Sequence, residues 1–488
     1  VVYRGVNVYT PDQLRHFSSE LQECAQTAQI SPLLIALDHE GQYVTRFSSG
    51  VTVFPAAMAL GATGYPNYSY LAAKTSGSEL AYCGVNVVLG PVADVLGDYD
   101  NSVISQRSYG EDPKLVSQFV AQAVIGYHQA GILPVLKHFP GHGGIADDSH
   151  YTLPVDQADL SSLELEYLPP FQSGLEVGSP LIMFSHVAFP NVDLSGNPAT
   201  LSPSLVVLLR DQLGFQEVIL TDSMGMGAIT QRGLNIAEAS LQAVNAGMDM
   251  LLITSPASAK DTRDRLLLAV RQGEISTARI DDAVRRILAV KAAWGMKSFP
   301  LSQVASPDWS SDARLASDIG YRAVTLYRDE NRLIPIPSEV NNLLIIGPTD
   351  GWGLYSILGT ALAESGYTYH VVTYSSPWNG RIPERSYLDT LPNQALSYDL
   401  ILMFTWEAHL NRIRYGDDWQ IELVNRLQAT DPPMIVVALK SPTDILEFPQ
   451  ISTYVATYGT TGGQLHGLAE ALVGRWQLVG QNPLPNLP

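Results

Sequence analysis

The sequence predicts an α/β protein with two domains. Short apolar runs alternate with amphipathic stretches along nearly all of the 488 residues, and this pattern is typical of βα repeats and parallel sheets. Hydrophobic residues make up 46% of the chain and charged residues 16%, which is the balance of a globular protein. Single cores seldom grow beyond about 300 residues, so a chain of this length is expected to divide.

The first part of the chain predicts a (β/α)8-type TIM barrel. Most of its apolar runs end in a polar, charged or Gly-rich loop, and the active site of such a barrel lies at the carboxyl ends of its strands. Only seven runs are recognisable, so either one strand escapes the pattern or the first βα unit is lacking. The abrupt start of the chain favours a barrel without its first βα unit. The seven expected strands are residues 1–3, 33–37, 85–89, 133–136, 181–184, 218–220 and 250–253.

A second α/β pattern follows Pro337. Residues 280–295 predict the last helix of the barrel, with Gly295 as its C-cap, and the next segment is richer in Pro, Ser and Asp. The second pattern predicts an open, doubly wound sheet, that is, an αβα sandwich. Its expected strands are 343–346, 370–373, 400–404, 434–439 and 453–457. The predicted division is a barrel domain at 1–296, a linker at 297–338 and a C-terminal αβα-sandwich domain at 339–488.

The composition excludes several classes of partner. The net charge is −19, whereas nucleic acids and anionic membranes require a positive surface, so no nucleic-acid partner is expected. No apolar run reaches the roughly 18 residues of a membrane helix, so no transmembrane segment is predicted. Cys24 and Cys83 are the only cysteines, which excludes a disulfide framework. The sequence makes no prediction of the oligomeric state.

The densest group of reactive side chains follows the fourth expected strand. From Lys137 to His150 the chain places one Lys, three His and two Asp among Gly and Pro residues. Burying so many polar groups in an inert loop would be costly, so we interpret the segment as functional. A zinc site formed by His138, His142 and His150 is the alternative. The spacing fits no common zinc pattern and the Lys137 ammonium would repel a cation, so no metal is predicted.

Asp222 is the second candidate, because it stands at the carboxyl end of the expected strand 218–220. Such a residue either caps the next helix or takes part in chemistry. The Asp148–Ser–His150 segment lies at the same end of the expected barrel, and this favours chemistry. Carboxylates and cations gathered on one concave face suit a ligand rich in hydroxyl groups. Other polar residues that follow strands are Asp38, Glu40, Arg46, Asp94 and Arg107.

Nine segments resemble, in order, the successive motifs of glycoside hydrolase family 3. The motifs KHFPGH…DSH and TDSMGM are the specific ones. AVTLYRDENRLIPI and the later α/β pattern are similar to the second domain of that family, so the resemblance spans nearly the whole chain. The nine segments are DHEGQYVTR, GPVADV, RSYGEDP, KHFPGHGGIADDSHYTLP, LIMFSHVAFPNVD, PATLSPSLVVLLR, VILTDSMGMGAI, NAGMDMLL and RIDDAVRRIL.

The DSH element resembles the β-N-acetylglucosaminidase (β-hexosaminidase) branch of the family. In that branch a His on this loop, paired with an Asp two residues earlier, is the acid/base. The resemblance therefore implies Asp222 as nucleophile, His150 as acid/base and Asp148 as its partner, with a covalent glycosyl-Asp intermediate, retained configuration and no cofactor. The sugar-binding positions that it implies are Asp38, Arg46, Arg107, Lys137 and His138.

The implied partner is a carbohydrate, and the implied reaction is hydrolysis of terminal β-linked N-acetylglucosamine from peptidoglycan fragments or chitooligosaccharides. A β-glucosidase or xylosidase of the same family, or an N-acetylglucosaminide phosphorylase, is the alternative enzyme. A non-catalytic sugar-binding protein is the alternative of a different class. Two residues beside Asp38 depart from the family pattern, because His39 stands where Gln is usual and Gln42 where Gly is usual.

Overall fold

The computed structural model describes residues 1–295, 304–349, 352–375 and 385–488. These residues form two compact units, each of which is described by itself. The first unit comprises Val1–Thr52, Ser69–Ile104 and Gly110–Asp312. The second comprises Val53–Tyr68, Ser105–Tyr109 and Ala313–Pro488. Of the predicted linker, residues 297–303 lie outside the described residues.

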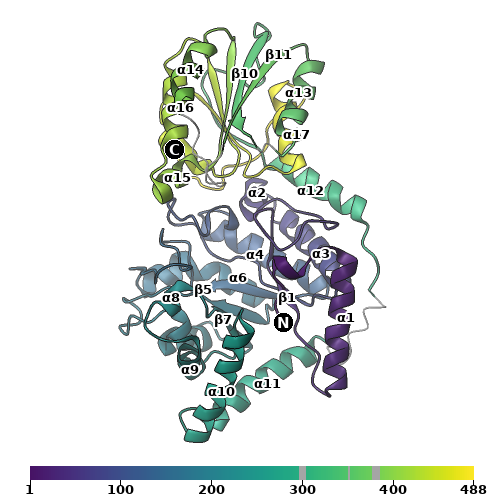
Figure 1. The fold of residues 1–488 in the computed structure, drawn as a ribbon, viewed down its shortest axis with the longest axis vertical. Helices are drawn as coiled ribbons and strands as arrows, with labels where there is room; N and C mark the ends of the chain where they lie inside the picture. Colours follow the sequence, from purple (N-terminus) through teal and green to yellow (C-terminus); the bar gives the residue numbers. More distant parts are fainter. Residues whose placement is uncertain (296–303, 350–351, 376–384) are drawn as a thin grey trace. The chain divides into compact units, whose positions relative to one another are not determined.

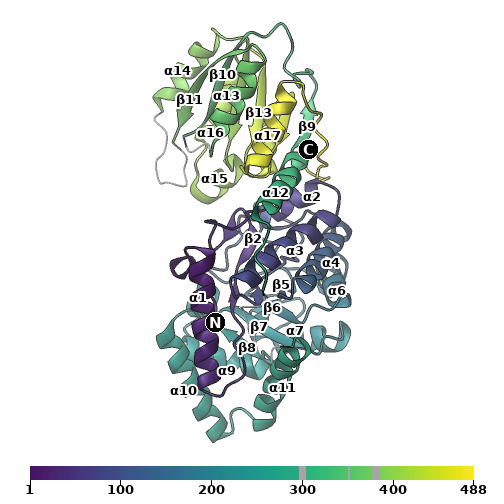
Figure 2. The same cartoon turned by 90° about the vertical axis from the view of Figure 1, so that its right-hand side faces the viewer.

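The first unit is built on a parallel sheet in the order β1-β4-β5-β6-β7-β8, so strands that follow one another in this series also pair. Figures 1 and 2 show these strands following one another through the unit. The strands are β1 (Ala36–Leu37), β4 (Val87–Val88), β5 (Leu133–Phe139), β6 (Leu181–Phe184), β7 (Val218–Ser223) and β8 (Met250–Leu252).

The predicted fold class is confirmed, with one difference at the edge of the sheet. Six of the seven expected strands form, whereas residues 1–3 contribute only an isolated parallel bridge between Val2 and Ala36. Among the described residues no pairing joins β8 to that edge, so the sheet is a curled half-barrel.

Side chains along each strand point alternately to the two faces of the sheet, so the core of the first unit is divided between these faces. Val88 packs with residues of α3 (Asn67–Tyr82) and α4 (Pro113–Gln129) on one face. Val87 and Leu89 belong to a separate cluster on the other face, which also contains Val290 of α11 (Thr277–Ala293). The period of two in a strand sends neighbouring side chains to opposite faces, so both faces of this sheet are buried.

The second unit has a six-stranded sheet in the order β11-β10-β12-β13-β14-β9. All five expected strands form and pair in parallel. In Figure 1, α13 (Leu354–Glu364) and α17 (Gly462–Leu472) cover one side of this sheet, and α14 (Ser386–Ala395) and α16 (Trp419–Gln428) cover the other. The strands are β10 (Asn342–Pro348), β11 (Thr368–Tyr374), β12 (Leu400–Thr405), β13 (Met434–Ala438) and β14 (Thr453–Ala456).

The segment expected as a linker contains regular structure. Within its described residues lie α12 (Trp309–Ala323) and β9 (Thr325–Asp329). β9 pairs antiparallel with β14 at the edge of the second sheet. β9 is short and half-polar, so its sequence does not form an apolar run that would predict a strand. None of the described helices is both long enough and apolar enough to cross a bilayer.

Candidate active site

Lys137 and Asp38 form the centre of a charged cluster in the first unit. Lys137 lies in the buried strand β5, and its Nζ donates to Asp38 Oδ1 at 3.0 Å and lies 2.5 Å from Glu40 Oε1. The ribbon of β2 (His39–Gly41) and β3 (Val44–Thr45) returns the chain so that Arg46 Nε donates to Asp38 Oδ2 at 3.0 Å. Burial favours neutral Asp38, but the charges of Lys137 and Arg46 outweigh it and hold the pKa of Asp38 well below its usual range.

Asp94 follows β4 and organises the turn after β5. It accepts hydrogen bonds from the backbone N–H of His138 at 3.3 Å and of His142 at 2.8 Å, and its Oδ2 lies 2.7 Å from His138 Nδ1. Burial would raise the pKa of Asp94, but the charges of His138 and His142 keep it below its usual value. The sequence marks Asp94 as a polar residue after a strand, but only the structure reveals this anchoring role.

Asp148 and His150 form a hydrogen-bonded pair within one loop. His150 Nδ1 lies 2.7 Å from Asp148 Oδ1, which also accepts the backbone N–H of His150 at 2.8 Å. Burial would raise the pKa of Asp148, and the hydrogen bonds from His150 lower it below its usual value. The carboxylate therefore stays ionised and orients the imidazole ring.

Asp222 lies at the carboxyl end of β7, after four buried residues. Its Oδ1 accepts the backbone N–H of Ser223 at 2.6 Å. Burial would raise the pKa of Asp222, but the charges of His138, His186 and Lys137 and the hydrogen bond from Ser223 keep it below its usual value. The interpretation of Asp222 as a helix cap is wrong, because α8 (Gly227–Thr230) begins later and has Met226 at its N-cap.

His186 supports the residue that follows Asp222. It comes after β6, and its Nε2 lies 3.0 Å from the carbonyl oxygen of Ser223 while its Nδ1 lies 2.7 Å from Thr200 Oγ1. Burial lowers the pKa of His186, against the opposing effect of the Asp222 charge. His186 is not among the residues that the sequence predicts, although its place directly after an apolar strand matches theirs.

The structure brings most of the predicted residues together. Direct hydrogen bonds connect Asp38 with Arg46 and with Lys137, and the charge of His138 acts on Asp222. Arg107 ends the 3-10 helix η2 (Ser105–Arg107), in a segment that belongs to the second unit.

The three imidazoles of the alternative zinc site have different protein partners. His138 Nδ1 is bound to Asp94 and His150 Nδ1 to Asp148, while His142 Nε2 lies 2.9 Å from Ser149 Oγ. Within the part of the chain that the structure describes, no group of three or more His, Cys, Asp or Glu side chains is arranged to hold a metal ion.

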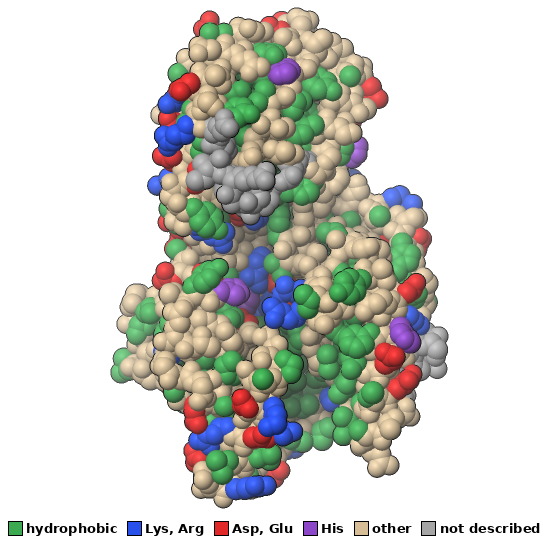
Figure 3. All heavy atoms as spheres, in the orientation of Figure 1, with side chains coloured by type: hydrophobic (Ala, Val, Ile, Leu, Met, Phe, Trp, Pro, Cys, Tyr) green, Lys and Arg blue, Asp and Glu red, His purple; other side chains and the backbone are tan. Residues whose placement is uncertain are grey.

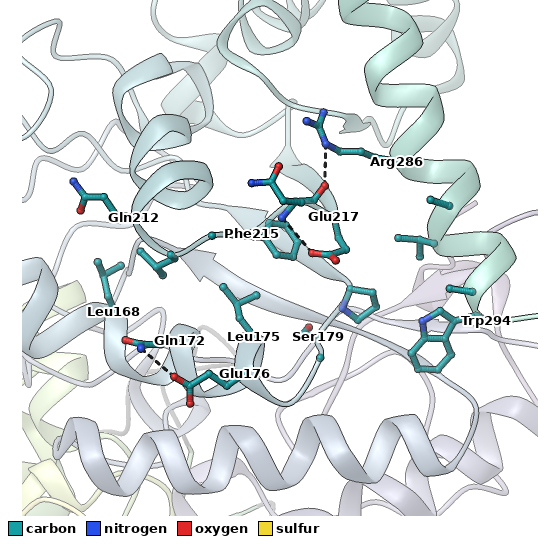
Figure 4. Close-up of a pocket in the computed structure, with 18 of the residues that line it drawn as sticks. Leu168, Gln172, Leu175, Glu176, Ser179, Gln212, Phe215, Glu217, Arg286 and Trp294 are labelled. Carbon is teal, nitrogen blue, oxygen red and sulfur yellow. Dashed lines mark hydrogen bonds between the residues drawn. The ribbon is translucent and has the colours of Figure 1, made fainter.

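A cavity of about 920 Å³ lies elsewhere in the first unit, where the chain enters β6 and β7. Its wall is formed by α6 (Leu168–Glu176), α11 and the segments before the two strands. In Figure 4, Gln172 donates to Glu176 at 3.0 Å, and Arg286 Nε donates to the carbonyl of Gln216 at 2.9 Å. None of the predicted site residues lines this cavity, which lies at the amino ends of the strands, opposite to Asp222.

The chain is similar in sequence and fold to known proteins. Residues 1–290 match the family described as glycosyl hydrolase family 3 N terminal domain. "Beta-hexosaminidase A" of Pseudoalteromonas piscicida is 30% identical over 373 residues, which is 70% of this chain and 61% of that protein. "Beta-N-acetylglucosaminidase/beta-glucosidase" of Cellulomonas fimi is 26% identical over 94% of this chain and 84% of its own length.

One solved structure matches both units. It is a glycoside hydrolase family 3 β-N-acetylglucosaminidase from Paenibacillus sp. str. FPU-7, with a TM-score of 0.88 and 32% sequence identity. The match covers 99% of this chain and 92% of that one. The family match over residues 1–290 extends across more than half of the chain and ends beyond every strand of the half-barrel. This chain therefore belongs to glycosyl hydrolase family 3.

Proposed function

We propose that the chain is a retaining β-N-acetylglucosaminidase with Asp222 as its nucleophile. The observation that carries the proposal is an ionised carboxylate at the end of β7, in the same unit as a His–Asp pair on the loop after β5. The names of the Pseudoalteromonas and Cellulomonas relatives and of the Paenibacillus structure support N-acetylglucosaminides as the substrate class.

In the proposed reaction, Asp222 attacks the anomeric carbon while the bond to the leaving oxygen breaks. His150 gives its Nε2 proton to that oxygen, since its Nδ1 is bound to Asp148. A water molecule then attacks the same anomeric carbon and passes a proton to His150 Nε2, while the bond from that carbon to Asp222 breaks and the carboxylate is released. Two inversions give net retention, and Asp148 stabilises the imidazolium that forms in the second step.

The charged cluster around Lys137 is proposed to bind the sugar. Asp38 offers a carboxylate acceptor, while Lys137, Arg46 and His138 offer donors. Each hydroxyl group of a pyranose ring can donate a hydrogen bond to the carboxylate or accept one from these donors. We assign Arg107 to the same task on the resemblance of its motif alone. Peptidoglycan fragments and chitooligosaccharides are the proposed sources of the terminal N-acetylglucosamine.

The nucleophile can be tested by trapping. A 5-fluoro N-acetylglucosaminyl fluoride slows both steps but carries a good leaving group, so the glycosyl-enzyme should accumulate in the unaltered protein. Peptide mass spectrometry is expected to locate the added sugar on Asp222. Asp222→Ala should lower kcat by roughly 10³-fold or more while sugar binding persists. A label on another residue, or full activity of Asp222→Ala, would refute the assignment.

The acid/base is tested with a matched pair in one loop. Asp148→Asn and His150→Ala should lower kcat/KM about 10²- to 10⁴-fold for substrates with poor leaving groups. Asp147 is exposed and adjacent, so Asp147→Asn is the control and should retain the activity of the unaltered protein. Equal loss in all three variants would contradict the specific role of Asp148 and His150.

Phosphorolysis is the alternative reaction. It is favoured by a base such as His150, which carries no negative charge when it is deprotonated. A neutral base repels an incoming phosphate less than a carboxylate would, and the attack on glycosyl-Asp222 would then yield the sugar 1-phosphate. A panel of aryl N-acetylglucosaminides, glucosides and xylosides, assayed with and without phosphate, separates the alternatives. We expect the highest kcat/KM on the N-acetylglucosaminide and free sugar as the product in both buffers.

A further inference from the structure

The loop of the proposed acid/base is attached to the segment that follows the proposed nucleophile. We call residues 148–151 the dyad loop. The carbonyl oxygen of His150 accepts the backbone N–H of Gly227 at 2.9 Å, and that of Ser149 accepts the N–H of Ala228 at 3.1 Å. Gly227 and Ala228 open α8, a few residues after Asp222. Two main-chain hydrogen bonds therefore connect the element of the acid/base to that of the nucleophile.

Gly227 is the point of closest approach between these two segments. A Cβ atom at this position would lie 2.3 Å from the carbonyl oxygen of Tyr151 and 2.7 Å from that of His150. Both are main-chain atoms and cannot rotate away, so a side chain would displace the dyad loop. Gly225, two residues earlier, differs: its nearest neighbours would be Ser223 Oγ at 3.8 Å and Thr254 Oγ1 at 3.9 Å, which is ordinary van der Waals contact.

A side-chain contact holds the dyad loop from its other side. Ser149 Oγ lies 2.9 Å from His142 Nε2, and both residues are buried. The backbone N–H of His142 is itself held by Asp94 at 2.8 Å. The loop is thus fixed between α8 and the turn after β5.

The hydrogen bond between Asp148 and His150 does not fix the position of His150 relative to Asp222. Both residues lie on the dyad loop, so their hydrogen bond orients the imidazole within the loop only. The His150 side chain is 60% exposed, and its position relative to Asp222 depends on where the loop backbone lies.

We propose that Gly227, Ser149 and His142 are positioning residues that fix the proton-transfer atom of His150 relative to Asp222. The inference rests on the proposed function, in which His150 is the acid/base. None of the three is assigned a contact with the substrate; they act through the loop backbone. Proton transfer requires a heavy-atom distance close to that of a hydrogen bond, so a displacement of the loop by about 1 Å is enough to slow the reaction.

The test compares kcat/KM for two aryl N-acetylglucosaminides. Departure of 2,4-dinitrophenolate needs no proton, whereas departure of phenolate depends on the acid. Gly227→Ala and Ser149→Ala should lower kcat/KM for the phenyl substrate about 10- to 100-fold, which is part of the roughly 10²- to 10⁴-fold that general acid catalysis contributes. The dinitrophenyl substrate should change less than about threefold. Ser149→Thr, which keeps a hydroxyl group, should restore most of the lost rate, and Gly225→Ala should match the unaltered enzyme.

His150→Ala separates a failure of this inference from a failure of the proposed function. If His150→Ala slows both substrates equally, the acid/base assignment is wrong. If His150→Ala shows the selective loss but Gly227→Ala and Ser149→Ala do not, the positioning role is refuted. An equal loss on both substrates in the glycine and serine variants would also refute it, because it indicates a general structural defect. Thermal unfolding checks each variant, and if Gly227→Ala does not fold, Ser149→Ala and Ser149→Thr decide the question.

Discussion

Lys137 shows how a single residue can couple stability and binding. Its side chain is only 2% exposed, yet its ammonium has two carboxylates as partners, Asp38 and Glu40. An unpaired charge in such a place would be strongly unfavourable, so the three side chains depend on each other. The arrangement keeps Asp38 ionised and fixes the donors and acceptors before any ligand arrives.

Replacing Lys137 by Met should therefore damage stability as well as binding. The substitution leaves Asp38 and Glu40 without their shared cation, and removing one partner of a buried pair typically costs about 3–5 kcal/mol. Urea denaturation at pH 7 measures the loss. Lys114 is exposed, so Lys114→Met is the matched control and should change the free energy of unfolding by less than about 0.5 kcal/mol. Equal midpoints for both variants would contradict the prediction.

At the scale of single elements, α3 carries a carboxyl group whose ionisation opposes folding. Glu79 is buried, and one of its oxygens accepts the backbone N–H of Thr52 at 2.8 Å. Burial, assisted by the charge of Asp312, raises the pKa of Glu79 to about 7. The folded protein therefore holds this proton more tightly than the unfolded chain, in which the pKa of Glu is about 4.3.

The stability contributed by Glu79 should be fully present below about pH 4.3 and lost as the pH rises through 7. Glu79→Gln keeps the size of the side chain and removes the titration, so its free energy of unfolding should depend less on pH between about 4.3 and 7. Urea titrations at several pH values measure this slope, which is about 1.4 kcal/mol per pH unit when one proton is released. Parallel curves for the variant and the unaltered protein would contradict the assignment.

Ion pairs with Asp249 attach α11 to the sheet of the first unit. Asp249, just before β8, has a fully buried side chain and forms ion pairs with Arg210, Arg279 and Arg286. Asp249→Ala leaves three guanidinium groups without this partner and should cost about 3–5 kcal/mol. Arg285 on the same helix is 68% exposed and pairs with Asp282, so Arg285→Gln should cost less than about 1 kcal/mol. Chemical denaturation of both variants gives the comparison, and similar losses would contradict it.

For the whole molecule, buried groups with shifted pKa values determine how stability depends on pH. The chain has a net charge of −19, and on the face seen in Figure 3 acidic and basic side chains are interspersed. Two buried groups favour mildly acidic conditions, because burial raises the pKa of Asp444 to about 6 and that of Glu79 to about 7. Asp38, Asp94 and Asp222 act in the opposite direction, since their pKa values lie below the usual value.

The free energy of unfolding should therefore fall as the pH drops from about 5 to 3. Below about pH 4, the unfolded chain binds protons more tightly than Asp38, Asp94 and Asp222 do in the folded state, so stability falls. Above about pH 5, the raised pKa values of Glu79 and Asp444 lower stability as the pH rises. Burial lowers the pKa of His39 to about 4 and also lowers that of His186, which has the opposite effect, so the two sets of groups offset each other. Denaturation from pH 3 to 8 measures the curve. Equal or greater stability at pH 3 than at pH 5 would contradict this prediction.

The sequence predicts the parts of the fold and of the site that depend on local pattern. Buried strands such as β5 and β7 begin with continuous apolar runs, and Lys137, Asp148 and Asp222 stand out because they follow such runs. β9 is missed, because an edge strand with polar residues has no such pattern. The positioning roles of His186 and Ser149 depend on hydrogen bonds to segments distant in the chain. Residue type and spacing carry no information about such contacts.

The attachment of the dyad loop through main-chain atoms has a consequence for evolution. Backbone N–H and C=O groups are the same whichever side chains are present, so the Gly227 and Ala228 bonds place no condition on the side chains at positions 148 and 150. Mutation can therefore exchange the proton-donating side chain while the two backbone hydrogen bonds that hold its loop are kept. A lineage with this scaffold can explore new leaving groups and new acceptors by altering the side chain at position 150, without first rebuilding the loop that presents it.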